Sequence, residues 1–252
     1  MKLNVVILAG APNNGPLRKV SEMEHEALIK IAELPMVEYV IRAVNQARYI
    51  DKIAVVGHKG EMERIIQDKV DFYVESVGSM KDNIFKGLEV FKDSEYLLIM
   101  TSDIPLITGE DIDEYIETCL SDNKADIYYP IIPKKLNQEK FPSVKRTYFH
   151  LAEGVFTGGN MVIIRPQILE GNTGLLEKAI AWRKKPWKLS RLLGMKFILK
   201  FVIGHLSITE IENKVAMLTG CKGHFMITNH PEIGFDVDKP SDLKIMEGKI
   251  IS

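Results

Sequence analysis

Residues 3–15 read LNVVILAGAPNNG, an apolar run that breaks directly into a loop of small and turn-forming residues. The run from Leu3 to Leu8 is apolar nearly throughout and does not alternate, which is typical of a strand buried on both faces of a parallel sheet. Glycines in the following loop permit positive φ angles and the close approach of an anion. The stretch predicts a first strand followed either by a phosphate-binding loop or by an ordinary turn, and it matches neither the Walker A motif nor the GxGxxG fingerprint.

Further apolar runs and amphipathic segments alternate along the first half of the chain. Strands are predicted at 52–56, 72–74 and 96–100, and helices at 36–48, 61–68, 80–91 and 108–120. Strands at 126–132, 159–164 and 224–228 and a polar, proline-bounded loop at 133–142 are predicted in the second half. The alternation favours an α/β fold with right-handed crossovers and a mostly parallel sheet. No repeat or low-complexity linker divides the chain, so we expect a single domain over 1–252.

Composition excludes several classes of protein. The 252 residues are 46% hydrophobic and 27% charged, which excludes a disordered or fibrous chain. A net charge of -1 gives no global reason to expect a nucleic-acid partner. Two cysteines, Cys119 and Cys221, are too few for a disulfide framework and favour a reducing cytosol. The longest apolar stretch, at 197–208, is shorter than the roughly 20 residues that a membrane span needs.

Two acidic segments are candidates for a metal site. Asp103 follows an apolar strand directly, at the edge where open α/β sheets bind their ligands. Magnesium requires oxygen ligands, and one or two carboxylates suffice when substrate phosphates and waters complete its shell. Asp236 and Asp238 alternate in an extended segment, so one of them could complete the site with Asp103. A turn at Ile104-Pro105 and a helix cap at Asp238 are the structural alternatives, and a structural role is favoured for Asp242.

Six segments together resemble the MobA-like NTP transferases, relatives of molybdenum-cofactor guanylyltransferase and of the cytidylyltransferases of isoprenoid synthesis. They are LAGA at 8–11, LIKIAELPMVEYVIRAV at 28–44, SVGSMKDNIFKGLEVF at 76–91, TSDIPLI at 101–107, FTGGNMVIIRP at 156–166 and DVDKPSDL at 236–243. Their order and spacing cover most of the chain. The resemblance implies a Rossmann-like, three-layer α/β/α sandwich of the glycosyltransferase-A, or nucleotide-diphospho-sugar transferase, type.

The resemblance also implies site residues. The loop after the first strand, with Leu8, Ala9, Gly10, Ala11 and Gly15, would hold the phosphates of an NTP, and Gly78 and Ser79 would lie near its base and ribose. Asp103, with Asp238, would bind Mg²⁺. Gly158, Gly159 and Asn160 would face a phosphorylated acceptor, whose phosphate attacks the α-phosphorus and expels pyrophosphate.

The sequence departs from the family pattern at the phosphate loop. Ala11 replaces the second glycine, the Arg-Met-Gly-like element is missing, and Glu26 stands where a phosphate-binding lysine is usual. Three consequences remain open: Lys19, Arg18 or Lys30 replaces the cation, Glu26 helps to bind metal, or transfer is weak or absent. We favour Lys19 or Arg18. The leading hypothesis is a magnesium-dependent nucleotidyltransferase, and the alternatives are a nucleotide-binding regulatory module without transfer and a glycosyltransferase that uses a nucleotide sugar.

A basic, apolar insertion is predicted at about 174–220, mostly helical. Between 178 and 209 it carries no acidic residue and eight basic ones, namely Lys178, Arg183, Lys184, Lys185, Lys188, Arg191, Lys196 and Lys200. Trp182, Trp187 and apolar residues up to Val202 accompany them, which is the composition of an interfacial membrane helix. A solvated helical subdomain, recognition of a small-molecule or lipid-phosphate acceptor, peripheral membrane contact through 182–202 and a homodimer interface are all compatible with it. We expect a cytoplasmic protein, with the inner membrane face as a possible peripheral location.

Overall fold

The run Leu3–Leu8 forms strand β1 at the centre of a nine-stranded sheet in the computed structural model, which describes residues 1–121, 124–169 and 194–251. β1 lies between β4 (Ile50–Gly57) and β6 (Leu97–Thr101) and is parallel to both. Each neighbour satisfies the backbone hydrogen bonds along one edge of β1, and the side chains of β1 are buried on both faces. The two-sided burial explains why these strands are apolar throughout.

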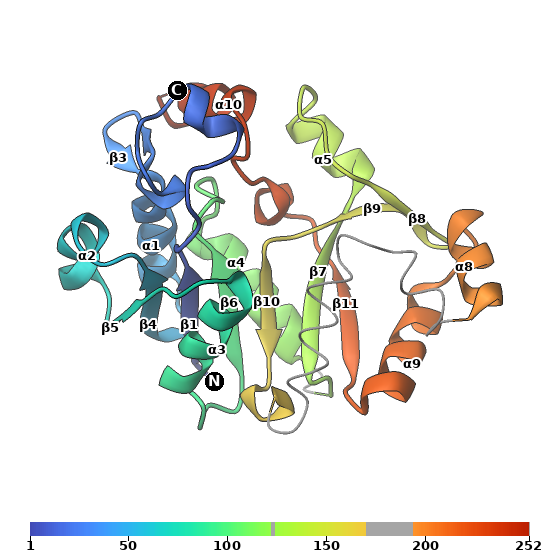
Figure 1. Cartoon of the computed structure of the whole chain (residues 1–252). Coiled ribbons are helices and arrows are strands. Elements are labelled where there is room, and N and C mark those ends of the chain that lie inside the picture. The colour runs from blue at the N-terminus through green and yellow to red at the C-terminus, as the bar shows by residue number, and fades with distance from the viewer. Residues whose placement is uncertain (122–123, 170–193, 252) are drawn as a thin grey trace.

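The sheet order is β5-β4-β1-β6-β10-β7-β9-β8, and β11 pairs with β7 outside this path (Figure 1). The remaining strands of the sheet are β5 (Phe72–Glu75), β7 (Ile127–Pro133), β8 (Phe149–Leu151), β9 (Gly154–Gly158), β10 (Met161–Ile164) and β11 (Gly223–Ile227). β10 is antiparallel to both β6 and β7, so β6 and β7 point in the same direction. β11 is parallel to β7, and the carboxyl ends of β1, β4, β6, β7 and β11 therefore share one edge of the sheet. A separate ribbon joins β2 (Lys30–Ile31) to β3 (Leu34–Pro35).

Helices cover both faces of the central strands. The α-helices are α1 (Met36–Gln46), α2 (Glu61–Ile66), α3 (Met80–Val90), α4 (Gly109–Leu120), α5 (Lys134–Lys140), α8 (Met195–Val202), α9 (Ile208–Thr219) and α10 (Pro240–Ile251). The short 3-10 helices are η1 (Pro16–Lys19), η2 (Glu26–Leu28), η3 (Gln67–Lys69), η4 (Pro166–Leu169) and η5 (Pro231–Gly234). Side chains of α1 and α4 share one core cluster with Val5 and Leu98, whereas α3 packs with Val6 and Ile99 on the opposite face. The predicted three-layer, mostly parallel α/β sandwich is confirmed.

Two local predictions in the second half were wrong. Residues 134–140 form helix α5 and not a loop, because Lys, Leu, Gln and Glu favour helix between the two prolines that bound the segment. The antiparallel hairpin of β8 and β9 was missed, since these strands are short and of mixed polarity. The hairpin extends the sheet beyond β7 and, with β11, builds a second lobe next to the parallel half (Figure 1).

Helices α4 and α9 begin at the capping residues that the sequence predicted. Thr108 with Asp111, and Ser207 with Glu210, form complete capping boxes at α4 and α9. Part of the predicted insertion at 174–220 forms α8 and α9, and its residues 174–193, including Trp182 and Trp187, lie outside the described residues. Among the described helices, none has the length and hydropathy required to cross a membrane.

Candidate active site at the carboxyl edge

The segment that follows β11 and η5 returns to the carboxyl end of β6. The backbone N–H of Val237 donates to the carbonyl of Asp103 at 2.9 Å, and the N–H of Asn160 donates to the carbonyl of Ile233 at 2.8 Å. Through these bonds the chain ends of β6, β9 and η5 are fixed against one another. Asp236 and Asp238, on either side of Val237, are thereby placed beside Asp103.

Asp103, Asp236 and Asp238 form a cluster whose carboxylate oxygens lie within 4.8 Å of one another. Burial, followed by the negative charges of Asp236 and Asp238, raises the pKa of Asp103 to about 7, although Thr101 Oγ1 donates to its carboxylate. Burial and then Asp236 also raise the pKa of Asp238. Without a cation, these groups repel one another.

The donor set suits a hard divalent cation. Three carboxylates supply only oxygen ligands, which is what Mg²⁺ prefers, and a bound cation would remove the repulsion that raises the pKa of Asp103. Arg146 pairs with Asp236 and partly compensates its charge, and both side chains are mostly buried. Asp242 has a capping role, because its carboxylate accepts the N–H of Asp238 at 3.3 Å.

The loop after β1 passes close to the loop after β5. A side chain at Gly10 would lie 2.7 Å from Ser76 Cβ and 3.0 Å from Asn83 Nδ2, so only glycine fits there. Asn83 also accepts the N–H of Val77 at 2.7 Å, which fixes the loop against the start of α3. Asn83 was not predicted from the sequence, because no local pattern distinguishes it from other helix residues.

Gly78 and Ser79 lie at this same junction, between the β5 loop and α3. Gly78 has a φ of +46°, a backbone conformation that favours glycine. The hydroxyl of Ser79 accepts the N–H of Asp82 and caps α3. Leu8 ends β1, and Ala9, which follows it, is fully buried with its N–H donating to the carbonyl of Val56 at 2.8 Å. Ala11 is exposed and Gly15 half-buried.

Glu26 lies close both to the loop after β1 and to the acidic cluster. A side chain at Gly15 would lie 3.6 Å from Glu26 Oε1, and Asp238 is close enough to raise the pKa of Glu26 after the larger effect of burial. Glu26 is therefore a fourth carboxylate at this edge, where the family usually has a cation.

The candidate replacement cations differ in their environment. The Arg18 guanidinium donates to the carbonyls of Glu22 and Met23 at 2.7 and 3.0 Å, which closes the turn after η1. Lys19 and Lys30 are exposed. Of the two cations that we favoured, only Lys19 has no role in closing this turn.

The segment Gly158-Gly159-Asn160 connects β9 to β10 beside the cluster. A side chain at Gly159 would lie 2.8 Å from Ile233 Cγ2 and 2.9 Å from Pro130 Cγ, so the close packing requires glycine. The carbonyl of Asn160 accepts the N–H of Thr101 at 3.1 Å, and its buried side-chain Nδ2 has no hydrogen-bond partner among the described residues. Among the described residues, this amide is therefore a buried donor without an acceptor, on the segment that is bonded to the end of β6.

The comparisons with known proteins show the family and the fold of the chain. Residues 5–183 match the family model described as the MobA-like NTP transferase domain. The chain belongs to this family. The predicted resemblance is confirmed, and the family is one of nucleotidyltransferase enzymes.

Individual relatives cover different shares of the chain. A hypothetical transferase structure from Thermus thermophilus is 30% identical, has a TM-score of 0.83, and the match covers 96% of this chain and 100% of that one. A nucleotidyl transferase from Methanothermobacter thermautotrophicus is 14% identical with a TM-score of 0.61 over 99% and 98% of the two chains, which shows a shared fold. The bifunctional protein GlmU of Aquifex aeolicus is 32% identical over 115 residues, 44% of this chain and 24% of the GlmU chain. The match thus spans about a quarter of that relative's length.

Proposed function

We propose that this MobA-like NTP transferase moves a nucleoside monophosphate from an NTP to a phosphorylated acceptor and requires Mg²⁺. An oxygen of the acceptor phosphate attacks the α-phosphorus, the bond from the α-phosphorus to the oxygen that bridges to the β-phosphorus breaks, and pyrophosphate leaves with that electron pair. The chain needs no covalent nucleophile for this step, because such transfers depend on positioning and charge neutralisation.

The observation that carries the proposal is the cluster of Asp103, Asp236 and Asp238, fixed by the hydrogen bond between Val237 and Asp103. These residues would hold Mg²⁺, which neutralises phosphate charge when it is bound. Leu8 to Ala11 and Gly15 would accommodate the phosphates, and Gly78 and Ser79 the base and ribose. Gly158, Gly159 and Asn160 would face the acceptor, and the free Nδ2 of Asn160 is a suitable donor to a phosphate oxygen.

Lys19 is our preferred cation for the triphosphate. It is exposed near the phosphate loop, whereas Arg18 is engaged by two backbone carbonyls. A Lys19→Gln variant should therefore raise the KM for NTP more than an Arg18→Gln variant of equal stability. The opposite ranking would assign the role to Arg18.

One observation favours a second candidate function. Glu26 adds a carboxylate beside Gly15 and Asp238, and it would repel a triphosphate there. A nucleotide-binding regulatory module without transfer is compatible with this. Glu26→Gln separates the two, since an enzyme should gain NTP affinity and turnover together, whereas a module should gain affinity with no pyrophosphate release.

The decisive experiment combines binding with turnover. Thermal stability is measured with each of the four NTPs, with and without Mg²⁺, for wild type and Asp103→Asn, because a ligand that binds only the folded state raises its stability. Pyrophosphate release is then followed with phosphorylated acceptors. A magnesium-dependent shift that disappears in Asp103→Asn supports the proposal. Absence of any shift rejects it, and tighter binding of nucleotide sugars than of NTPs would favour a glycosyltransferase that uses the two acids of Asp236-Val237-Asp238.

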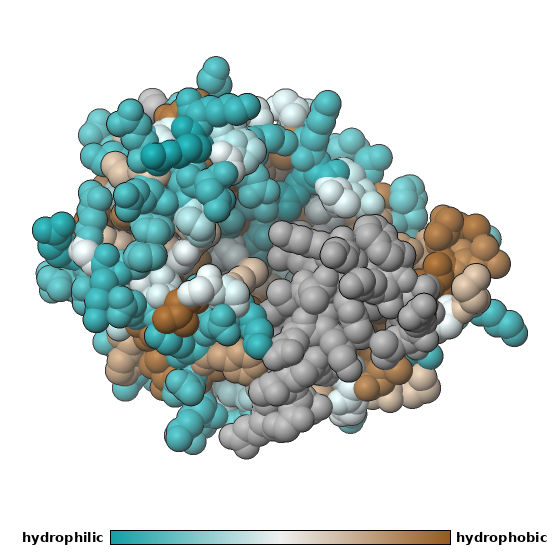
Figure 2. All heavy atoms as spheres, viewed as in Figure 1, coloured by the Kyte–Doolittle hydropathy of each residue, from teal (hydrophilic) through white to brown (hydrophobic). Residues whose placement is uncertain are grey.

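The proposed partners include a membrane surface. Helix α8 exposes Met195, Leu199 and Val202 to 79%, 63% and 74%. Their spacing of four and three residues places them along one face of the helix, with Lys196 beside them. Figure 2 shows this apolar patch at the edge of the molecule where α8 lies. We propose that α8 contacts an anionic membrane surface from the cytoplasmic side; vesicle binding tests this, and a dimer through the same face is the alternative outcome.

A further inference from the structure

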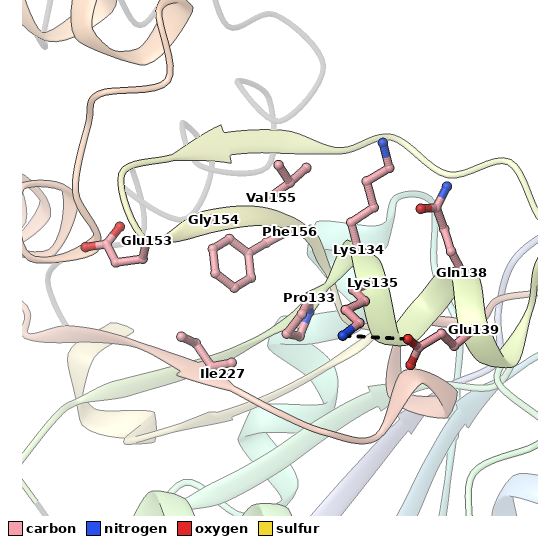
Figure 3. Close-up of a pocket in the computed structure, with 10 residues that line it drawn as sticks. All are labelled: Pro133, Lys134, Lys135, Gln138, Glu139, Glu153, Gly154, Val155, Phe156 and Ile227. Atoms are coloured by element: carbon pink, nitrogen blue, oxygen red, sulfur yellow. Dashed lines mark ion pairs between the residues drawn. The ribbon is translucent and has the colours of Figure 1, made fainter.

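A pocket of about 790 Å³ opens beyond the candidate active site, between the end of β7, helix α5 and the β8–β9 hairpin. Its apolar wall consists of Pro133, Val155, Phe156 and Ile227, and polar side chains of α5 and Glu153 form the rim. Figure 3 shows Pro133, Phe156 and Ile227 around one space, with Lys134 and Gln138 on the side of α5. The volume is in the range of sites that bury a small organic ligand.

The pocket lies at the same edge of the sheet as the acids. Pro133 and Ile227 end β7 and β11, which are parallel to each other, and β7 points in the same direction as β6. Ligands of open α/β sheets bind at this edge. The pocket therefore faces the side on which the reaction would occur.

One strand connects the pocket to the acidic cluster. Phe156 of β9 lines the pocket, the strand ends at Gly158, and the chain then passes through Asn160, whose carbonyl is bonded to Thr101. Phe156 lies four residues before Asn160 along nearly extended chain, so about 13 Å separates the pocket wall from the segment beside the acids. A molecule with its phosphate at Asp103 could reach the pocket only if it extends over about this distance.

The charged side chains on the rim favour an anionic ligand near Lys134. Lys135 is paired with Glu139 at 4.0 Å, and Glu153 accepts the N–H of Ile208. Lys134 is half-buried, its Nζ lies 5.4 Å from the centre of the Tyr148 ring, and it has no carboxylate partner among the described residues. Ile227, in contrast, leaves 49% of its surface exposed toward the open side.

From this arrangement we infer that the acceptor is an amphiphilic phosphate, whose alkyl or aryl part occupies the pocket while its phosphate lies between Lys134 and the acids. The inference rests on the proposed transferase function and names its acceptor class. A short sugar phosphate would leave the apolar wall hydrated, whereas an apolar group about 13 Å from the phosphate would cover it. The apolar wall and Lys134 would therefore distinguish acceptors by the length of their apolar part.

Calorimetry with dodecyl phosphate below its critical micelle concentration tests the pocket directly. Wild type should bind it in the presence of Mg²⁺, and Ile227→Asp should weaken binding at least tenfold, because a carboxylate would enter the apolar wall. Met217→Asp is the control, since it places the same charge on an exposed apolar residue of α9, outside the pocket and outside the exposed face of α8. Val202→Asp tests in the same way whether α8 binds the amphiphile. Lys134→Gln should weaken the binding of dodecyl phosphate but not the binding of dodecanol.

NTP binding, measured on the same samples, separates the two proposals. If wild type binds NTP but not dodecyl phosphate, or if Ile227→Asp binds it as tightly as wild type, the pocket is not the acceptor site and the transferase proposal stands. A loss of dodecyl phosphate binding in Val202→Asp alone would assign the binding to α8 and also overturn the inference. If no NTP binds, the transferase proposal fails first.

Discussion

The two halves of the sheet differ in how far they bury their apolar side chains. In the parallel half, Val5, Val6 and Leu98 are fully buried between helices on both faces. In the lobe of β7, β8, β9 and β11, Ile227 and the apolar face of α8 remain exposed. The first half thus uses its apolar residues for the core, and the second keeps part of them available for ligands and partners. The acidic cluster lies where the two halves meet.

The largest expected effect is at this junction. Asp103→Asn should lower the rate of pyrophosphate release by about 100- to 1000-fold, the usual cost of removing one electrostatic group from an active site. Without Mg²⁺ the same variant should be more stable than wild type, since it removes one of three mutually repelling carboxylates. Activity and melting temperature, measured with and without Mg²⁺, check both. A variant that loses activity and also melts lower in the absence of Mg²⁺ would show a structural role for Asp103.

The parallel half could be predicted from the sequence because burial on both faces leaves a local signal. Leu3–Leu8 and the helix at Met36 each show their periodicity within a few residues. In the lobe, β7 and β11 were predicted at 126–132 and 224–228, but the hairpin was not, since the short strands Phe149–Leu151 and Gly154–Gly158 acquire their identity only through pairing with each other and with β7.

The site residues also divide into those that a local sequence pattern predicted and those that it did not. Asp103, and the suggestion that Asp236 or Asp238 lies beside it, followed from a strand end and an alternating pair. Arg146 was missed because its partner Asp236 is 90 residues away and no local pattern connects them. Asn83 and the pocket at Phe156 were missed for the same reason. The roles of Lys19, Gly78, Ser79 and the 158–160 segment stay predictions.

Two helix glycines compare a tightly packed helix position with an open one. In α3, a side chain at Gly87 would lie 2.4 Å from Val6 Cγ1, so Gly87→Ala should destabilise the protein by about 1–3 kcal/mol through overpacking. In α10, nothing lies within 4 Å of the same position at Gly248, so Gly248→Ala should stabilise it by about 0.5–1 kcal/mol. Urea denaturation measures both. Equal effects of the two substitutions would mean that α3 is not packed as tightly against β1 as described.

A pH-dependent ion pair joins the lobe to the parallel half. His230, which follows β11, pairs with Asp111 at 2.7 Å and with Glu114 at 2.6 Å, both on α4. Its hydrogen bond to Asp111, and then that to Glu114, raise its pKa to about 9 against the effect of burial. A histidine with a raised pKa stabilises the fold fully below its unfolded value of 6.5, and this stabilisation is lost as the pH rises through about 9.

His230→Gln should therefore lower the free energy of unfolding by about 1–2 kcal/mol at pH 6 and by much less at pH 10. Urea denaturation at the two pH values gives the difference. His224→Gln is the control, because His224 also pairs with a glutamate, Glu212 at 3.0 Å, but belongs wholly to the lobe. If His230→Gln lowers the free energy of unfolding by the same amount at both pH values, the substitution removes packing contacts and not a charge interaction.

The smallest expected effect is that of Leu199→Ala, which is compared with Leu98→Ala in the other half. Leu98 in β6 and Leu199 in α8 are the same residue type, one fully buried and the other 63% exposed. Leu98→Ala should cost about 2–5 kcal/mol, whereas Leu199→Ala should change stability by at most about 0.5 kcal/mol. If α8 contacts a membrane as proposed, Leu199→Ala should still reduce binding to anionic vesicles, so an effect on partners would appear without one on folding. A stability loss at Leu199 comparable to that at Leu98 would mean that α8 belongs to a core, and the exposed apolar face would then need no partner.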